Sequence, residues 1–550
     1  MRIILDGQNV ELKTGSSYLD AVRILYPGDH RCVLGVRVQG RSLSLNDPAE
    51  EGLEAFSLTA RTEEGRRIYE RSIRFLLLMA MRRLYPEVSV RVENSTRLGL
   101  LVTLRGMTVD AGVAARIEKQ MKELVQADLP YQESRLTRSE AIDCFQRLGK
   151  RDDKVRLLGY QPRETFRLYT VDGVREYFYG VMAPSTAYTP VFAVHAREEG
   201  LELALPDPAD PTKTADFFES PLLMKTFAES RNWARILGCE NLADLNELIE
   251  RNELNDLIRV NEALHEKSVS EIADAFIRSG AQLILIAGPS SSGKTTFANR
   301  LSIQLRVRGL IPLKLSMDDY YRNRDELPRE ADGKHDLERV DALDVPRLGN
   351  DLAALLRGEP VDGPVFDFVA QRRSERVHRM QLKPGQPIIM EGIHALNDRI
   401  TEDVPRERKF QIYVSALTTM NMDDHNRIRT TDVRLLRRIV RDNMFRGTSP
   451  EGTMAMWDSV RRGEDNYIFP FQENADVMFN STLVYELAVL KKYAYPMLSQ
   501  ITGENPYYTR ANRIIKFLEY VYAVDAEDEI PPNSLLREFI GGCCFYREKN

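Results

Sequence analysis

Residues 282–308 read QLILIAGPSSSGKTTFANRLSIQLRVR. The Walker A pattern G-x-x-x-x-G-K-[ST] is satisfied by Gly288, Pro289, Ser290, Ser291, Ser292, Gly293, Lys294 and Thr295, and Thr296 follows it directly. The apolar run 282–287 before it is typical of a buried strand, and residues 296–308 after it have the pattern of a helix. Because the motif lies between a strand and a helix, we predict a P-loop that binds the phosphates of a nucleotide.

The chemistry of phosphate binding explains the residue types in this motif. Glycines let the backbone curl so that several N–H groups point at one phosphate, and the helix that follows adds its positive N-terminal end. The Lys294 ammonium neutralises charge on the outer phosphates, and the Thr295 hydroxyl can bind Mg²⁺. The sequence therefore predicts ATP and Mg²⁺ as cofactors, with residues 288–296 at the nucleotide.

Carboxylates follow two further strand-like runs. Leu313–Met317 leads into Asp318 and Asp319, and Pro387–Met390 leads into Glu391. Because ligands bind beyond the carboxyl ends of strands in open α/β sheets, Asp318 is predicted either to accept a substrate proton or to hold Mg²⁺ through water. Glu391 stands where a Walker B motif carries Asp, and we predict that it is a second anchor for Mg²⁺. For one of the two aspartates the alternative is a helix N-cap, a position that Asp favours.

Residues 432–442 read DVRLLRRIVRD, and the arginines of this segment are spaced so that they share one helix face. They are Arg434, Arg437, Arg438 and Arg441. We expect such a face to repel itself unless an anion lies against it, and arginine is well suited to clamp a triphosphate during transfer. The alternative is a solvated basic face that pairs with Asp432 and Asp442. No NKxD-like guanine-reading segment is found, which argues against a GTPase.

After residue 278, apolar runs alternate with amphipathic segments. The apolar runs are Leu283–Ala287, Leu313–Met317, Ile388–Met390, Phe410–Val414 and Val477–Phe479. This alternation predicts a parallel sheet covered by helices. The proline-rich segment 205–211 predicts a boundary before this part of the chain.

Composition excludes several classes of protein. The net charge of -6 gives no case for binding to nucleic acid or an anionic membrane through bulk charge. The five cysteines form no CxxC pair, which favours reduced thiols in the cytoplasm over a disulfide framework. The apolar run Phe75–Met81 is far shorter than the ~20 residues of a membrane helix, and the N-terminus does not have the pattern of a secretory signal. We therefore predict a cytoplasmic protein with no membrane partner.

The motifs of residues 282–481 together resemble the uridine/cytidine kinase and phosphoribulokinase group. The resemblance rests on the P-loop, Ser316–Tyr321, Asp341–Asp344, Pro364–Phe368, Glu391–Ile393 and the arginine helix. It implies an ATP-dependent phosphotransferase that acts on a nucleoside, with Asp318 as the catalytic base and Tyr321 lining the nucleoside site. It also implies that Asp341 helps to hold the sugar. Arg434, Arg437 and Arg441 would belong to a lid and would stabilise the transferring charge together with Lys294.

Two positions of the substrate site depart from the uridine kinase pattern. Phe366 stands where that family has Tyr, and Gln371 stands where it has His. Phe366 keeps a stacking surface but lacks a hydroxyl, whereas Gln371 can still donate and accept hydrogen bonds. We expect both residues at the substrate, and the nucleobase stays open because one matched hydrogen bond in a closed site can change specificity by orders of magnitude.

The front half resembles parts of aminoacyl-tRNA synthetases. Residues 1–60 resemble a TGS domain, a small β-grasp module, and residues 61–205 resemble the second additional domain of threonyl- and alanyl-tRNA synthetases. The second resemblance rests on Arg71–Leu77, Ile117–Met121 and Asp128–Pro130, with a weaker segment at Glu176–Thr186.

The metal ligands of that synthetase domain are replaced in this chain. The family's editing site has an H-x-x-x-H pair and a C-x-x-x-H pair, and the matching positions here are Arg71, Phe75, Phe178 and Met182. We expect no zinc site and no editing activity. A scaffold or protein-contact role is favoured over contact with RNA, because the chain is acidic overall and shows no basic stripe.

These predictions combine into an α/β protein of five parts. The parts are a TGS-like β-grasp domain (1–60), an α+β synthetase-like domain (61–205), a helical linker (206–278), a P-loop kinase domain (279–485) and a C-terminal helical tail (486–550). The predicted reaction is transfer of the γ-phosphoryl group of ATP to a nucleoside 5′-hydroxyl. Two alternatives stay open: a kinase for another small hydroxyl compound such as a sugar phosphate, and an ATP-switched regulator associated with RNA or ribosomes. The sequence also leaves a homo-oligomer open.

Overall fold

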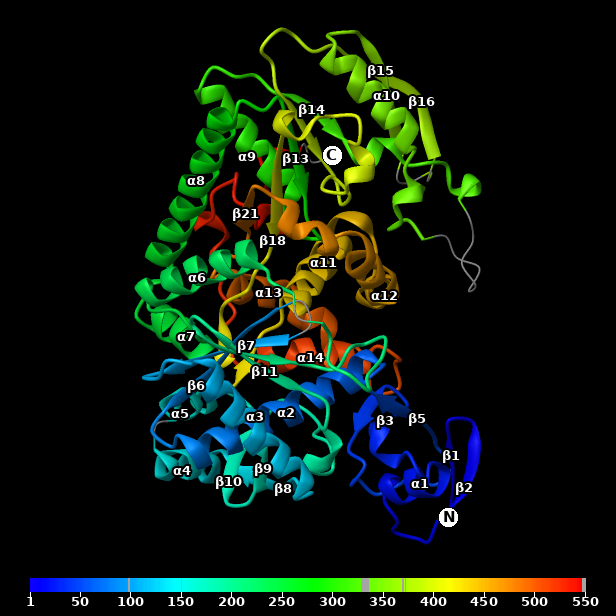
Figure 1. The fold of residues 1–550 in the computed structure, drawn as a ribbon, viewed down its shortest axis with the longest axis vertical. Coiled ribbons are helices and arrows are strands. Elements are labelled where there is room, and N and C mark those ends of the chain that lie inside the picture. The colour runs from blue at the N-terminus through cyan, green and yellow to red at the C-terminus, as the bar shows by residue number, and fades with distance from the viewer. Residues whose placement is uncertain are drawn as a thin grey trace.

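The computed structural model of the chain describes residues 1–96, 99–149, 151–216, 218–327, 336–367, 370 and 372–546. Figure 1 shows most of the predicted kinase part, residues 279–485, in the upper half of the view and residues 1–205 in the lower half. Helices α13 (Glu486–Leu498) and α14 (Tyr508–Leu518) lie between the two halves.

The kinase part is built on a five-stranded parallel sheet in the order β14-β17-β13-β18-β21. Its strands are β13 (Leu283–Ala287), β14 (Leu313–Ser316), β17 (Ile388–Glu391), β18 (Lys409–Ser415) and β21 (Val477–Asn480). They coincide with the apolar runs of the sequence, because strands that are buried on both faces read as continuous apolar segments. The predicted α/β fold with a parallel sheet covered by helices is confirmed.

Helices cover both faces of this sheet. On one face, α8 (Leu254–Ser279) and α9 (Lys294–Val307) pack against Ile284 and Ile286. On the other face, α10 (Val345–Leu356) packs in a cluster with alternate residues of the same strand, Leu283 and Leu285. The remaining elements of the kinase part are β15 (Val361–Asp367), β16 (Arg372–Met380), β19 (Asn421–Asp423), β20 (Asn426–Arg427), α11 (Thr430–Arg446), α12 (Pro450–Tyr467) and α15 (Arg537–Ile540).

Residues 1–60 form a five-stranded sheet in the order β2-β1-β5-β3-β4 with one helix packed on it. The elements are β1 (Arg2–Leu5), β2 (Gln8–Glu11), α1 (Tyr18–Leu25), β3 (Val33–Val38), β4 (Arg41–Leu43) and β5 (Glu54–Thr59). Helix α1 begins with a capping box, in which Ser17 and Asp20 satisfy each other's backbone N–H groups. Strands β1 and β5 are parallel, whereas the other neighbours are antiparallel.

The described residues between 61 and 205 contain two antiparallel sheets and four α-helices. The first sheet has the order β11-β12-β7-β6 and the second has the order β10-β9-β8. The elements are α2 (Glu63–Leu84), β6 (Ser89–Ser95), β7 (Gly99–Arg105), α3 (Ala111–Gln126), β8 (Gln132–Thr137), α4 (Arg138–Leu148), α5 (Asp152–Gly159), β9 (Thr165–Val171), β10 (Val174–Tyr177), β11 (Ala193–Arg197) and β12 (Gly200–Ala204). The apolar segment Phe75–Met81 of α2 is buried in the core of the front half.

Buried polar contacts join the front half to the kinase part. Arg67 in α2 forms an ion pair with Asp432 in α11 at 3.0 Å. Lys154 in α5 pairs with Asp423 at 2.8 Å, and both side chains are fully buried. The segment 206–278 adds α6 (Pro221–Ile236) and α7 (Leu242–Glu250) before α8. The front half is therefore packed against the kinase through charged groups that must stay paired.

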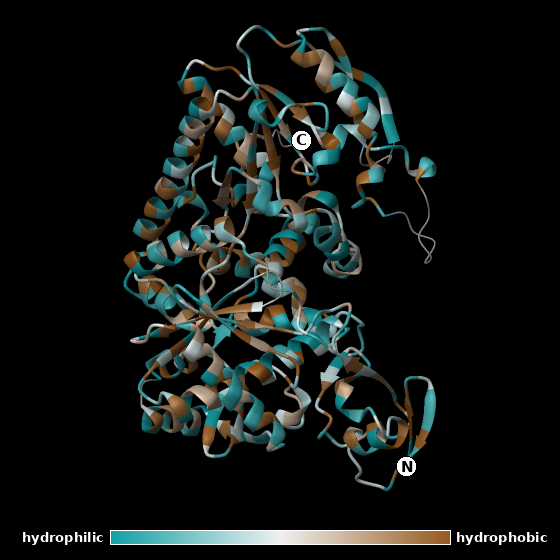
Figure 2. Ribbon diagram, in the orientation of Figure 1, coloured by the Kyte–Doolittle hydropathy of each residue, from teal (hydrophilic) through white to brown (hydrophobic). Residues whose placement is uncertain are grey.

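Apolar residues gather in the strands and on the inner faces of the helices, as Figure 2 shows in brown. In the part of the chain that the structure describes, no helix combines the length and the apolar character that crossing a membrane requires.

Candidate active site

The predicted phosphate-binding loop connects β13 to α9 at the carboxyl edge of the kinase sheet. A Cβ atom on Gly288 would lie 1.9 Å from the carbonyl oxygen of Val414, so this position requires glycine. Gly293 has a φ of +86° and ends the loop directly before Lys294, the first residue of α9. The nine predicted nucleotide-binding residues thus form one strand–loop–helix turn, as such a motif requires.

The three predicted metal ligands approach one another beside this loop. Thr295 Oγ1 donates to Glu391 Oε1 at 3.3 Å. Burial and the nearby Asp318 carboxylate raise the pKa of Glu391 to about 7, although Lys294 acts in the opposite direction. The Asp318 carboxylate thus lies close enough to Glu391 to act on its pKa. A hydroxyl and two carboxylates suit Mg²⁺, which keeps several waters and uses few protein ligands.

The two adjacent aspartates after β14 have different surroundings. Asp319 Oδ1 accepts a hydrogen bond from the backbone N–H of Phe366 at 3.2 Å and so holds β15. Burial raises the pKa of Asp318, and the Lys294 ammonium opposes that rise. Neither aspartate caps the short helical turn Met317–Tyr320, because Ser316 is its N-cap. Asp318 is therefore the carboxylate that faces the phosphate-binding loop.

The predicted substrate residues are only partly brought together. Tyr321 is buried, and its ring centroid lies 5.8 Å from that of Phe366. Asp341 is exposed and lies 3.4 Å from both Arg339 and Arg399. Gln371 lies outside the described residues. The structure therefore supplies an aromatic wall beside Asp318, whereas Asp341 stands at the outer rim.

Glu338 was missed by the sequence reasoning. Burial raises the pKa of its carboxyl to about 7, and the charges of Arg438 and Lys294 act against that rise. Its backbone and Cβ pack so close to α12 that a Cβ on Gly463 would lie 2.3 Å from Glu338 Cβ. In the sequence it is one acid among several charged residues before Asp341, so no pattern distinguished it.

The arginine helix α11 differs from the prediction. Arg434 and Arg437 are each 1% exposed, and each is paired with a buried carboxylate, Glu464 and Glu486 respectively. The expectation that these arginines need an anion to separate them is wrong, because α12 and α13 supply carboxylates that are distant in the sequence. Both arginines also bind the loop: Arg434 Nη1 donates to Ser290 O at 3.1 Å, and Arg437 Nη1 donates to Ser291 O at 3.4 Å.

For the other two arginines of α11, the structure agrees in part with the alternative prediction of a basic face that pairs with Asp432 and Asp442. Arg438 and Arg441 both pair with Asp442, at 3.2 and 2.9 Å. Asp432, by contrast, binds Arg67 from the front half. Arg438 also donates to Ser290 Oγ at 2.9 Å, so its face points toward the phosphate-binding loop and is not simply solvated.

Comparison with known proteins agrees with this geometry. Residues 283–488 match the family described as "Phosphoribulokinase / Uridine kinase family". The uridine kinase of Deinococcus deserti is 31% identical over 197 residues, which are 36% of this chain and 86% of that protein. The chain belongs to the phosphoribulokinase / uridine kinase family. The uridine kinase of Lactobacillus johnsonii is 32% identical over 197 residues, which are 36% of this chain and 84% of that protein.

Membership in the phosphoribulokinase / uridine kinase family makes this chain an ATP-dependent kinase. Among solved structures, a D-glycerate 3-kinase from Cryptococcus neoformans is 15% identical, and the match covers 51% of this chain and 89% of that chain with a TM-score of 0.18. The family match lies in the second half of the chain, where the P-loop, Asp318 and Glu391 meet.

The C-terminal segment of this kinase lies against the phosphate-binding loop. A Cβ on Gly293 would lie 2.7 Å from Leu535 Cδ2. Glu538 in α15 accepts a hydrogen bond from Thr296 Oγ1 at 2.6 Å, and the Tyr546 hydroxyl lies 3.4 Å from the same oxygen. The sequence indicated no chemical role for this tail. The structure places one of its carboxylates at Thr296, the residue that directly follows the Walker A motif.

We expect Glu538→Gln to tighten ATP binding by roughly three- to tenfold, which corresponds to about 1 kcal/mol of relieved repulsion. Glutamine keeps an oxygen that can accept from Thr296 but removes the negative charge beside the phosphates. The dissociation constant of ATP, measured by calorimetry, checks this result. Glu529→Gln is the matched control, since Glu529 lies in the same tail but pairs with Arg259. Weaker ATP binding by Glu538→Gln would instead indicate a carboxylate that supports Mg²⁺.

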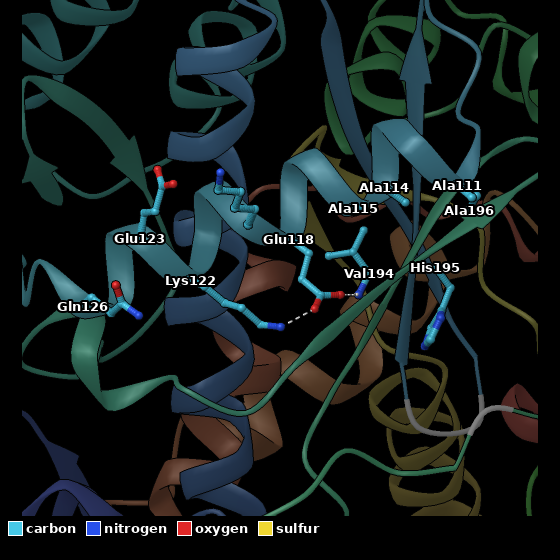
Figure 3. Close-up of a pocket in the computed structure, with 11 residues that line it drawn as sticks. Ala111, Ala114, Ala115, Glu118, Lys122, Glu123, Gln126, Val194, His195 and Ala196 are labelled. Atoms are coloured by element: carbon cyan, nitrogen blue, oxygen red, sulfur yellow. Dashed lines mark hydrogen bonds and ion pairs between the residues drawn. The ribbon is translucent and has the colours of Figure 1, made fainter.

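The front half contains a hollow of its own, away from the kinase site. A hollow of about 890 Å³ lies between α3 and β11 in the front half, as Figure 3 shows. Its Glu118 accepts from the Val194 N–H at 2.9 Å and forms an ion pair with Lys122. Glu118 and Lys122 are already paired with each other. We therefore place the catalytic site at the P-loop edge of the sheet and not in this hollow.

Proposed function

We propose that this kinase transfers the γ-phosphoryl group of ATP to the 5′-hydroxyl of a nucleoside. The position of Asp318 is the main support for the proposal. The charge of Lys294 acts on the pKa of the Asp318 carboxyl, and Asp318 in turn raises the pKa of Tyr321, so Asp318 lies near both. A base therefore stands between the phosphate-binding loop and an aromatic wall. Tyr321 and Phe366 supply flat surfaces on which a nucleobase can stack. The uridine kinases among the relatives support the same class of substrate.

The proposed reaction is an in-line transfer. The P-loop N–H groups and Lys294 hold the outer phosphates of ATP. Thr295 and Glu391 would hold Mg²⁺, which neutralises phosphate charge when it is bound. Asp318 accepts the proton of the 5′-hydroxyl while that oxygen bonds to the γ-phosphorus, and the bond from that phosphorus to the β–γ bridging oxygen breaks to release ADP.

The arginines of α11 divide into two roles in this proposal. Arg434 and Arg437 act through the loop backbone, because their charges are already balanced by Glu464 and Glu486. Arg441 keeps the predicted role of stabilising the transferring charge, because it is less deeply buried than these two and lies on the same face as Arg438.

The direct test is ADP release from ATP and Mg²⁺ with a panel of nucleosides, nucleotides, sugars and sugar phosphates. We expect a nucleoside-dependent signal that Lys294→Ala abolishes, and the preferred base would show what Phe366 and Gln371 select. A signal only with a sugar phosphate or another hydroxyl compound would keep the kinase and replace the substrate. If no acceptor stimulated ADP release although ATP still bound, the alternative of an ATP-switched regulator associated with RNA or ribosomes would be favoured.

We assign the sugar-binding role to Glu338 in addition to the predicted Asp341. Glu338 lies close to Lys294, and it contributes to the raised pKa of Tyr321. Asp341 is exposed, with arginines 3.4 Å away. A carboxylate close to both the phosphate-binding lysine and the aromatic wall is well placed to accept hydrogen bonds from ribose hydroxyls.

We expect Glu338→Gln to raise the KM for the nucleoside by about 10- to 100-fold, because hydrogen bonds to a charged group contribute roughly 1.5–3 kcal/mol. The KM for ATP should change little. Asp341→Asn is the matched comparison and should have the smaller effect on the nucleoside KM. Steady-state kinetics with each substrate varied in turn separate these outcomes, and the reverse order would restore Asp341 as the main sugar ligand.

For the front half we propose a TGS-like domain and a synthetase-like domain that act as a scaffold for the kinase. The sheet order β2-β1-β5-β3-β4 with α1 supports a β-grasp module in residues 1–60. The buried pair of Arg67 with Asp432 supports the scaffold role, because it fixes the beginning of α11. Salt-sensitive binding of tRNA would instead favour the RNA-associated alternative.

A further inference from the structure

A cavity of about 310 Å³ lies where three parts of the chain meet. Ser42 contributes from the first sixty residues, the segments around β9 and β10 contribute from the synthetase-like part, and Lys516 contributes from α14. Arg71 in α2, which occupies a position expected for a metal ligand in the resembling family, lies in an adjoining hollow that shares Tyr179 and Lys516. The cavity is separate from the phosphate-binding loop of the kinase.

The walls of this cavity are strongly basic. The basic side chains that line it are Arg135, Arg163, Arg167 and Lys516, and no acidic residue lines it. Two acids bind some of these groups from outside. Glu519 accepts from Arg163 at 2.8 and 3.0 Å, and Glu133 lies 3.1 Å from Arg167 and 3.9 Å from Arg135.

Two cations remain without a carboxylate within 4 Å among the residues that the structure describes. Lys516 has no hydrogen-bond or ion-pair partner there, and burial with the charges of Arg163 and Arg71 lowers its pKa to about 8. Burial, with the charge of Arg74, likewise lowers the pKa of Arg71 to about 9. Glu519 acts on Lys516 and Glu70 acts on Arg71 only from beyond ion-pair distance. Burial of these two like charges therefore costs free energy, and an anion between them would reduce that cost.

The orientation of Arg71 is fixed by its surroundings. Its Nε donates to the carbonyl oxygen of Val181 at 2.8 Å. Its guanidinium lies so close to Gly180 that a Cβ there would be 2.9 Å from Arg71 Cζ. Ser42 Oγ adds a buried hydroxyl that has no hydrogen-bond partner among the described residues. A guanidinium, an ammonium and a hydroxyl are the types of donor that bind phosphate oxygens, and Lys516 lines both hollows.

We propose that this cavity binds a small phosphorylated compound, no larger than a nucleoside monophosphate, with its phosphate at Lys516 and Arg71. The size follows from the volume, which lies near the lower end of the roughly 300–1,000 Å³ of ligand sites. Phosphate is favoured over a carboxylate because several arginines and a lysine converge from different elements. Such a ligand touches both the front half and α14, so it would stabilise their contact.

The test measures binding of inorganic phosphate and of inorganic pyrophosphate to the full chain by calorimetry. The Lys294→Ala variant is used throughout, so that binding at the P-loop contributes little. We expect one binding event, which weakens at higher salt. Lys516→Gln and Arg71→Gln should each weaken it by tenfold or more. Lys122→Gln is the matched control, because Lys122 is a cation of the same front half that already pairs with Glu118.

Thermal stability separates a binding role from a structural one. Lys516→Gln removes a cation whose charge has no partner, so we expect its melting temperature to stay equal or to rise while phosphate binding is lost. The ligands should raise the melting temperature of the Lys294→Ala protein but not that of its Lys516→Gln derivative. Absence of binding, binding that both pocket variants retain, or binding of RNA without binding of either small phosphate would each overturn the proposal.

Discussion

Asp318→Asn lowers kcat by about 10²- to 10⁴-fold, the usual contribution of a general base, while ATP still binds. Asparagine keeps the shape of the side chain but cannot take a proton from the substrate hydroxyl. Burial raises the pKa of both aspartates. Asp318 carries this role because Lys294 acts on it, whereas Asp319 is bound to the Phe366 N–H. Single-turnover kinetics with saturating ATP measure the chemical step directly.

Asp319→Asn is the matched control for this prediction. The amide oxygen can still accept from the Phe366 N–H, so β15 keeps its place and most of the turnover should remain. If Asp318→Asn kept normal turnover, the proposed base would be wrong. If both variants lost activity together with ATP binding, the two aspartates would act on the shape of the site.

The same carboxylates set the expected pH profile. Burial and the Asp318 carboxylate raise the pKa of Glu391 to about 7, so Glu391 loses its charge as the pH falls below neutrality. The raised pKa of Asp318 acts in the same direction. We expect kcat/KM to fall below about pH 7, and higher Mg²⁺ to move this limb to lower pH because the cation favours the ionised forms.

Low pH has opposite effects on activity and on stability through Glu391: it lowers activity but stabilises the folded state. Its folded pKa lies above the ordinary value of 4.5, so the folded state binds the proton more tightly than the unfolded state. This contribution is present at acid pH and is lost as the pH rises from about 4.5 to about 7. Glu391→Gln should therefore raise the melting temperature at pH 8 while it weakens the response to Mg²⁺.

Arg434→Met costs about 3 kcal/mol or more of folding free energy and weakens ATP binding, because it leaves Glu464 buried with one fewer partner. The pair also holds the loop: Arg434 donates to Ser290 O, and Glu464 accepts from Ser290 N–H at 3.2 Å. Denaturant unfolding measures the stability, and calorimetry measures the affinity for ATP.

A double variant separates the two functions of this pair. Replacing Arg434 and Glu464 together by methionine removes both buried charges, so much of the stability should return. ATP affinity should stay low, because Ser290 loses both contacts. Normal ATP binding by the double variant would show that the pair serves the fold alone. Arg441→Met is the control within α11, and we expect it to lower turnover with little loss of stability.

The sequence determined the parts of this site that are contiguous. The Walker A motif, the strand before it and the helix after it follow from residues 282–308, because glycine positions and apolar periodicity are local properties. The carboxylates at 318 and 391 were also found, since each ends an apolar run and parallel strands place their carboxyl ends at one edge of the sheet.

Only the tertiary structure decided which charges are paired. Glu464 and Glu486 lie 30 and 49 residues beyond Arg434 and Arg437, yet they neutralise them. Glu338, Glu538 and the basic cavity around Lys516 depend on the packing of segments that are distant in the chain. Side-chain type reports charge, whereas partner, burial and hence pKa depend on which segments fold against each other, and a local pattern does not contain that information.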